Sequence, residues 1–278
     1  MQQFRASDGA CIAFDDEGDG RPLVMLHGLM ANRGFFDGQR PLAGSFRLIR
    51  PDLRGHGDSR IGSAGASVDR MAEDIAELAV ALDLRDAVLV GWSLGASVLW
   101  KVLTGPASTR FAGAVVIDMT PRVRNDSDWA LGLSGEHCAA RSEAIRDDFQ
   151  SFAKAAGAAI FTQGDEERQV ALRCWAGEEF ARNAGEEIGA VWASLVEADF
   201  RPLLPHILQP TLIVHGVNSH LYGADTADHL VAALPNARAI AFDHSGHSPH
   251  IEQPELFNHI LGDFANGLTR LRDTAATH

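Results

Sequence analysis

Short runs of apolar residues alternate along this chain with longer segments in which apolar residues recur at helical spacing. Short apolar runs bounded by turn formers are typical of strands buried on both faces, and the longer segments are typical of crossover helices. The alternation therefore predicts an α/β fold with a mostly parallel sheet and helices on both faces. The expected strands are 11–14, 23–27, 46–50, 87–91, 114–118, 211–215 and 238–242.

Two crossover helices are predicted from periodicity, at 68–82 and 254–268. The first places Met71, Ile75 and Leu78 on one face, and the second places Leu256 and Ile260 on one face. An apolar stripe at this spacing is typical of a helix that packs against a sheet.

The alternation stops between residues 122 and 198. This segment is rich in Ala, Glu and Arg, carries scattered Trp and Phe, and contains no clear strand. A structureless loop of that length is uncommon inside a compact domain, so we expect a small helical insertion. We call this insertion the cap. The predicted domain division is a core of residues 1–121 and 199–278 and a cap of residues 122–198.

Charge narrows the classes of partner. The 278 residues hold 24 Lys and Arg against 37 Asp and Glu, a formal net charge of -13. Such a chain repels nucleic acid and anionic membrane surfaces, so neither is expected as a partner. Many acidic residues fall between Glu136 and Glu187, which predicts a solvated outer surface of the cap.

The cysteines and the N-terminus suggest a reduced, cytoplasmic protein. Cys11, Cys138 and Cys174 have no CxxC spacing, so buried thiols are expected rather than a disulfide framework or a zinc cluster. The chain starts without a basic segment followed by an apolar run, and no apolar stretch is long enough to span a membrane. His244 and His250 flank His247 at a spacing of three, but without accompanying Cys or carboxylates they predict no metal site. No cofactor is expected.

The strongest chemical signal is Ser93, in the sequence Gly-Trp-Ser-Leu-Gly at 91–95, where a predicted strand ends and a helix begins. A nucleophile on such a sharp turn needs small residues two positions before and after it, and Gly91 and Gly95 meet that need. The first N–H groups of the helix then lie beside the serine. The N–H of Leu94 is therefore a candidate oxyanion donor.

Two further segments contribute candidate groups. The strand at 23–27 runs into His27-Gly28, after which the N–H of Leu29 can turn inward as a second oxyanion donor. His247 follows Gly246 in a loop after the last strand and before the last helix.

Four segments in this order resemble the α/β-hydrolase superfamily, and the resemblance covers essentially the whole chain. His27-Gly28 is similar to the oxyanion segment of that family, Asp-Leu-Arg-Gly-His-Gly-Asp-Ser at 52–59 to its Gly-rich turn, Ser93 to its nucleophile, and Gly246-His247 to its general base. The resemblance implies an α/β-hydrolase sheet with the cap inserted after strand six. It also implies structural roles for His27 and His56.

The catalytic acid departs from the commoner pattern. Many family members carry a carboxylate three residues after the Gly that ends strand seven, where this chain has Ser219. Asp118, at the carboxyl end of the preceding strand, is the candidate instead, since that edge of the sheet also carries Ser93. An Asp-x-x-Pro here and a Gly-x-x-Ser after strand seven resemble a branch of short-acyl esterases. Asp225 and Asp243 remain weaker alternatives.

These residues predict a serine hydrolase that cleaves a carboxylic ester of a small or medium acyl substrate through an acyl-enzyme, with the triad Ser93, His247 and Asp118. The alternatives on the same triad are a lactone hydrolase, for instance of acyl-homoserine lactones, a perhydrolase, and a C–C bond hydrolase. Dehalogenases and epoxide hydrolases of this fold use an Asp nucleophile and are set aside. A non-catalytic ligand-binding protein is the remaining alternative.

Substrate contacts are predicted from aromatic and apolar residues near the nucleophile and in the cap. The candidate substrate-binding residues are Trp92, Met30, Trp129 and Trp192, with a small-molecule ester or lactone as partner. Arg122 and Arg124 at the start of the cap are interpreted as solvated surface charge. The expected assembly is a monomer or a homodimer.

Overall fold

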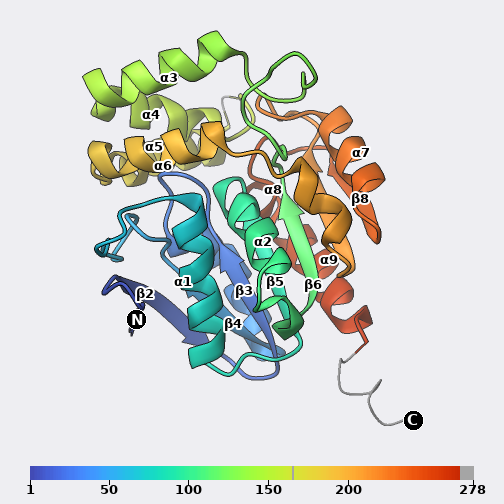
Figure 1. Cartoon of the computed structure of the whole chain (residues 1–278). Helices are drawn as coiled ribbons and strands as arrows, with labels where there is room; N and C mark the ends of the chain where they lie inside the picture. Colours follow the sequence, from blue (N-terminus) through green and yellow to red (C-terminus); the bar gives the residue numbers. More distant parts are fainter. Residues whose placement is uncertain (165, 270–278) are drawn as a thin grey trace, which may run out of the picture.

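A twisted sheet of eight strands forms the centre of the molecule. The computed structural model describes residues 1–164 and 166–269. The strand order is β1-β2-β4-β3-β5-β6-β7-β8 (Figure 1). The β1–β2 and β2–β4 pairs are antiparallel, and the other neighbouring pairs are parallel. The strands are β1 (Gln2–Arg5), β2 (Cys11–Glu17), β3 (Arg21–Leu26), β4 (Phe46–Pro51), β5 (Ala87–Trp92), β6 (Phe111–Ile117), β7 (Thr211–Gly216) and β8 (Ala237–Phe242).

The predicted α/β fold is thus confirmed, and all seven predicted strands are present. Strands β5, β6 and β7 are buried along their whole length, as their apolar runs indicate. The edge strand β1 was not predicted, because it is mostly exposed and has no apolar run.

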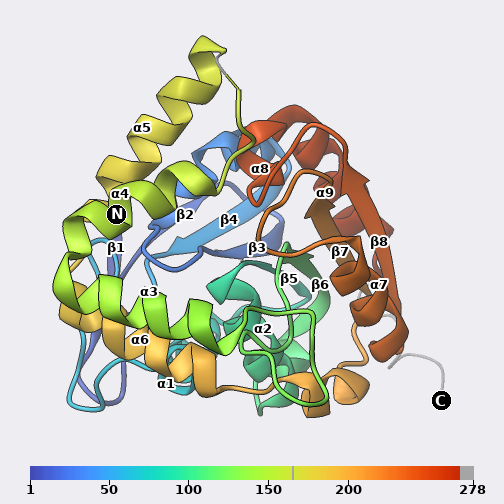
Figure 2. The same ribbon diagram turned by 90° about the horizontal axis from the view of Figure 1, so that it is seen from above.

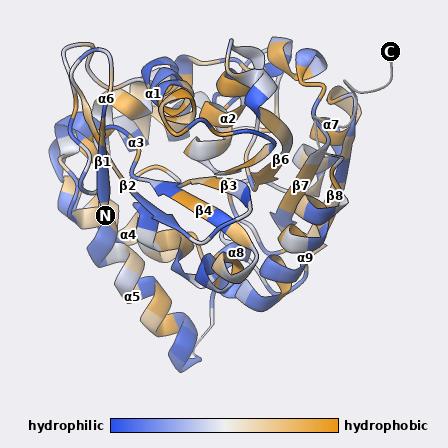
Figure 3. Cartoon of the chain, turned by 90° about the horizontal axis from the view of Figure 1, so that it is seen from below, coloured by the Kyte–Doolittle hydropathy of each residue, from blue (hydrophilic) through white to orange (hydrophobic). Residues whose placement is uncertain are grey.

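Helices cover both faces of the sheet. Helices α1 (Val68–Ala81), α2 (Leu94–Thr104) and α7 (Ala224–Ala233) lie on one face, with the short turns η2 (Ser108–Arg110) and η3 (Arg201–His206). The opposite face carries η1 (Arg33–Gly44), α8 (Pro249–Glu252) and α9 (Pro254–Gly267) (Figure 2). In Figure 3 the hydrophobic colour is found in central strands such as β6, whereas the edge strand β1 is hydrophilic. In α1 the buried stripe includes Met71, Ile75 and Leu78, as the periodicity predicts.

In the described part of the chain, four α-helices between β6 and β7 form the helical cap. They are α3 (Gly135–Asp147), α4 (Phe149–Ala159), α5 (Glu167–Ala181) and α6 (Gly185–Glu197). Figures 1 and 2 place them above the carboxyl ends of the strands. Among the acidic residues of this segment, Asp165 lies outside the described residues. Glu136 and Glu186 are examples of exposed acidic residues of the cap.

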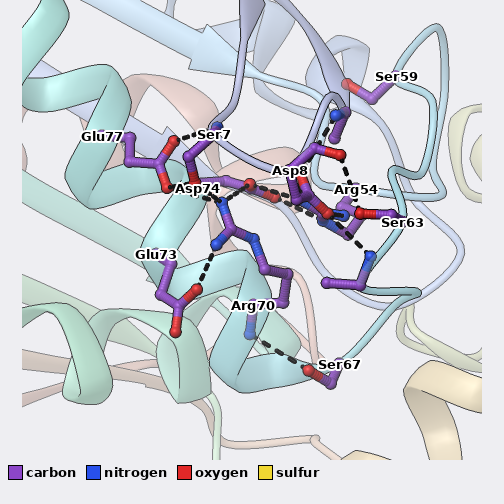
Figure 4. Close-up of polar contacts among 12 residues, drawn as sticks. Ser7, Asp8, Arg54, Ser59, Ser63, Ser67, Arg70, Glu73, Asp74 and Glu77 are labelled. Carbon is purple, nitrogen blue, oxygen red and sulfur yellow. Dashed lines mark hydrogen bonds and ion pairs between the residues drawn. The ribbon is translucent and has the colours of Figure 1, made fainter.

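A buried arginine fixes the Gly-rich turn after β4. Arg54 binds Asp74 of α1 through Nε and Nη2 at 2.8 and 2.7 Å, and Asp8 of the β1–β2 hairpin through Nη1 and Nη2 at 2.7 and 2.9 Å (Figure 4). A fully buried guanidinium needs such paired carboxylates, because an unpaired buried charge is very costly. The Gly-rich turn is therefore anchored to two other elements.

The thiols are only partly as expected. All three cysteines are free, but Cys138 alone is buried, whereas Cys11 is partly buried and Cys174 is exposed. The expectation of three buried thiols is thus wrong, because Cys174 lies on the outer side of cap helix α5. Across the described residues, no helix has the length and apolar character needed to cross a membrane.

Candidate active site

Ser93 lies on a strained turn between β5 and α2. Its φ of 52° falls in a region that residues with a side chain rarely adopt. The turn brings strand and helix so close that a Cβ on Gly91 would lie 2.5 Å from the Gly95 carbonyl oxygen. A Cβ on Gly95 would lie 2.1 Å from the Leu26 carbonyl oxygen. Both glycines are therefore required by the backbone, for the reason predicted from the sequence.

Asp118 contacts His247 at the carboxyl edge of the sheet. The Nδ1 of His247 lies 2.6 Å from Oδ2 of Asp118, and both side chains are buried. Ser219, in the loop after β7, donates its hydroxyl to the same Oδ2 at 2.6 Å. The Ser219 oxygen in turn faces the N–H groups of Leu221 and Tyr222, each at 3.4 Å. In the commoner pattern the catalytic carboxylate stands at position 219. Here Ser219 stands at that position and contacts the carboxylate of Asp118.

The alternative acids lie elsewhere. Asp225 is exposed in the first turn of α7, and Asp243 is exposed at the start of the histidine loop. Neither has a contact with His247 in the described part of the chain. Of the three candidates, the structure brings Asp118 alone to the histidine.

Glu252 holds the loop that carries His247. Its Oε2 accepts from the N–H of Gly246 at 2.7 Å, and its Oε1 accepts from the N–H and hydroxyl of Thr162 at 2.7 and 2.9 Å. Thr162 lies between cap helices α4 and α5, so one carboxylate joins the cap to the histidine loop. Burial raises the pKa of Glu252. On the other side of the loop, the indole N–H of Trp92 donates to the His247 carbonyl at 2.8 Å.

His27 fixes the segment that leads to Leu29. Its Nε2 accepts from the N–H of Leu53 at 2.9 Å, so its Nδ1 carries the proton and donates to the Gly28 carbonyl at 2.8 Å. Burial lowers the pKa of His27 to about 4, which keeps the ring neutral. The N–H of Leu29 has no acceptor within the described residues, and the N–H of Leu94, at the first position of α2, has no intrahelical acceptor. Both N–H groups are free to bind an oxyanion.

A small cavity of 60 Å³ joins these groups. Ser93, His247, Leu29, Met30 and Trp92 line it, together with cap residues Arg141, Ala156, Ala159, Ile160 and Phe180, and with Leu221 and Gly28. Ser93 and His247 share this wall without a hydrogen bond between their side chains in the described chain. Catalytic hydrogen bonds are often long before substrate binds, so this geometry is compatible with their pairing.

Two of the four predicted substrate contacts do not reach the cavity. Met30 and Trp92 line it, but Trp129 and Trp192 are absent from its wall. Trp129 packs edge-on against His229, with ring centroids 4.8 Å apart, and lies beneath Arg201. Trp192 packs beneath Arg141. The sequence of the cap does not show whether an aromatic residue faces the cavity or packs behind its wall.

Arg141 is the charged residue of the cavity wall that the sequence did not indicate. The arginines that were considered, Arg122 and Arg124, are instead paired with acids: Arg122 with Asp126 and Asp199, and Arg124 with Glu197. Their interpretation as surface charge fits these pairs.

Known proteins are similar to this chain over nearly its whole length. A family model described as the alpha/beta hydrolase family matches residues 23–260. The chain is 33% identical over 253 residues to a pimeloyl-[acyl-carrier protein] methyl ester esterase of Nitrosomonas europaea, covering 89% of this chain and 97% of the relative. It is 32% identical over 279 residues to a non-heme chloroperoxidase of Streptomyces lividans, covering 93% and 97%. A solved esterase from Exiguobacterium antarcticum superimposes with a TM-score of 0.89 at 27% identity, covering 95% and 99%.

Proposed function

Because the chain belongs to the alpha/beta hydrolase family, we propose that it hydrolyses carboxylic esters through a Ser93–His247–Asp118 triad. The observation that carries the proposal is the contact of 2.6 Å between Asp118 Oδ2 and His247 Nδ1 in a cavity that Ser93 also lines. Asp118 fixes the tautomer in which Nδ1 is protonated. The Nε2 of His247 is then free to act as a base.

Acylation follows from this arrangement. His247 takes the hydroxyl proton of Ser93 while Oγ attacks the ester carbonyl, and the carbonyl oxygen becomes an oxyanion. The N–H groups of Leu29 and Leu94 bind that oxyanion, and the Asp118 carboxylate stabilises the imidazolium. The C–O bond to the alcohol then breaks, His247 gives its proton to the leaving alkoxide, and the acyl group remains on Ser93.

Deacylation repeats the sequence with water. His247 takes a proton from a water molecule, which attacks the acyl carbonyl and forms a second oxyanion. The N–H groups of Leu29 and Leu94 bind this oxyanion as well. The Ser93–acyl bond breaks and His247 returns the proton to Oγ, releasing the carboxylic acid. The strained turn and the buried Asp118 hold these groups in place, so little reorganisation accompanies the reaction.

Labelling and turnover test the proposal together. A fluorophosphonate is expected to modify the wild type at Ser93, located by peptide mass, and to leave Ser93→Ala unmodified. The wild type should hydrolyse p-nitrophenyl acetate and butyrate, and Ser93→Ala should lose at least about 10³-fold in kcat/KM. Ester binding without turnover by the wild type would instead favour the non-catalytic alternative.

Perhydrolysis is the second candidate, since a non-heme chloroperoxidase is among the relatives at 32% identity. Hydrogen peroxide in place of water would attack the same acyl-enzyme and give a peracid. Acetate-dependent bromination at rates comparable with ester hydrolysis would favour it. Lactone opening and C–C bond hydrolysis use the same triad, but no separate observation favours them.

The proposal extends to the domain division and to the cellular compartment of the enzyme. Residues 122–198 would act as the cap over the site, and residues 1–121 and 199–278 as the catalytic core. Free cysteines without disulfide partners are typical of a reducing compartment, which supports a cytoplasmic enzyme.

A further inference from the structure

Arg141 places a permanent positive charge in the wall of the catalytic cavity. It extends from cap helix α3 and is half-buried. Among the described residues that line the cavity, it is the one side chain that is charged regardless of pH. The remaining wall is mainly apolar, with Met30, Ile160 and Phe180 as examples.

The guanidinium is held by an aromatic platform. Its Cζ lies 5.5 Å from the centre of the Trp192 ring, within the range of a cation–π contact. Trp192 is buried in α6, and its indole N–H donates to the Ser142 hydroxyl of α3 at 3.1 Å. Two cap helices thus fix the plane on which Arg141 lies.

In the described part of the chain Arg141 has no acidic partner, unlike several arginines of the cap. Arg122, Arg124 and Arg146 form ion pairs with carboxylates. Within residues 1–164 and 166–269, no carboxylate or carbonyl oxygen accepts a hydrogen bond from Arg141, so its N–H donors are left to solvent. A neutral substrate that filled the cavity would remove water from these N–H groups without offering them an acceptor. Leaving a buried donor without a hydrogen bond costs free energy.

A carboxylate on the substrate removes that difficulty. It can accept two parallel hydrogen bonds from a guanidinium, in an arrangement stronger than a neutral pair. We propose that Arg141 binds a carboxylate carried by the substrate, so that the preferred substrates are esters with an acidic group a few atoms from the scissile carbonyl. Because the cavity is small, a short spacer between the ester and the carboxylate is the first to test, as in half-esters of four- or five-carbon dicarboxylic acids. This inference rests on the proposed ester hydrolysis.

Matched neutral and anionic esters test the acyl side. Monomethyl glutarate carries the carboxylate, and methyl glutaramate is its neutral amide analogue of nearly equal size. We expect the wild type to prefer the carboxylate ester by at least about tenfold in kcat/KM, because one hydrogen bond to a charged group contributes about that factor to binding. O-acetylglycolate against O-acetylglycolamide makes the same comparison on the alcohol side, and a preference in either pair supports the proposal.

Variants assign the preference to Arg141. In Arg141→Gln the ratio should fall to about one, and Arg141→Lys should keep part of it, because lysine keeps the charge but loses the planar fork. Arg146→Gln is the matched control, since Arg146 lies on the same helix, is exposed and pairs with Asp147. Its ratio should equal that of the wild type. Equal rates with both esters of each pair in the wild type, or an unchanged ratio in Arg141→Gln, would overturn the proposal while leaving ester hydrolysis intact.

A binding measurement keeps the anion site testable without turnover. Glutarate should raise the Tm of Ser93→Ala, glutaramide should not, and adding Arg141→Gln should abolish the shift. If no ester is hydrolysed in a Ser93-dependent manner, the proposed function fails. A Tm shift independent of Arg141 would then refute the anion site separately.

Discussion

At the scale of single residues, Ser219 stands where many α/β-hydrolases have their acid, yet it donates a hydrogen bond to Asp118. Ser219→Ala removes one of the two groups that hold Asp118 Oδ2 and is expected to lower kcat/KM for p-nitrophenyl acetate about tenfold. Ser219→Thr keeps the hydroxyl and should retain most activity. An alanine variant with the activity of the wild type would show that the serine does not position the acid.

The backbone at Ser93 predicts an unusual stability effect at the same scale. Ser93 has a φ of 52°, which glycine adopts without the strain of a side chain. Ser93→Gly should therefore have a free energy of unfolding roughly 1 kcal/mol higher than Ser93→Ala, measured by urea denaturation. Elsewhere Gly is normally the less stable of the two, so the reverse order would argue against strain at this turn.

Single residues also show where sequence reasoning reaches its limit. Ser93 was predicted from its Gly-flanked turn sequence, Asp118 from its place at a strand end, and His247 from the resemblance to the α/β-hydrolase superfamily. The carboxyl ends of parallel strands meet at one edge of the sheet, which brings such residues near one another. Arg141 was missed because a sequence does not show which arginines find an acidic partner. Trp192 was expected to touch substrate, but helical spacing does not distinguish a cavity wall from the layer behind it.

At the scale of elements, the corner between α5 and α6 supports the oxyanion segment. Asn183 donates to the Met30 carbonyl at 2.6 Å, and Asn32 donates to Glu179 at 2.8 Å. Asn183→Ala should therefore lower kcat/KM about tenfold, because the N–H of Leu29 loses a fixed position. Arg182→Ala is the control, as Arg182 is exposed at the same corner. Equal activity of both variants would show that the corner between α5 and α6 does not position the oxyanion segment.

The elements themselves were predictable to different degrees. The central strands were predicted because burial on both faces leaves an unbroken apolar run, and α1 and α9 because each buries one stripe. In α9 the buried stripe includes Phe257 and Leu261, whereas Leu256, which was expected on it, is exposed. The edge strand β1 and the segment η1 were not predicted. Exposure leaves β1 without an apolar pattern, and η1 contains glycines and Pro41, which interrupt helical periodicity.

At the scale of the whole molecule, three buried histidines predict loss of stability in acid. Burial lowers the pKa of His27 to about 4 and those of His56 and His250 to about 3, below the ordinary value of 6.5. Below pH 6.5 these side chains are protonated in the unfolded chain but still neutral in the folded protein. Stability is therefore complete above pH 6.5 and falls as the pH drops toward 4 for His27 and toward 3 for His56 and His250. Each should cost roughly 1 kcal/mol between pH 7.5 and 5.5.

His250→Phe isolates one of these contributions. His250 packs against Phe36, Trp92 and Phe257, and neither ring nitrogen has a partner in the described chain, so phenylalanine replaces it without losing a hydrogen bond. In urea denaturation, the drop in stability between pH 7.5 and 5.5 should shrink by roughly 1 kcal/mol in this variant. An unchanged drop would mean that His250 titrates normally in the folded protein.

The role of Asp118 as the acid is the central claim, and the kcat/KM of Asp118→Asn for p-nitrophenyl acetate tests it most directly. Asparagine keeps the shape but cannot stabilise the imidazolium of His247, so we predict a loss of at least about 10³-fold at pH 7. Ser219→Asp in the same variant should restore part of the rate, because it returns a carboxylate to the neighbouring strand end. Full activity of Asp118→Asn would contradict the account.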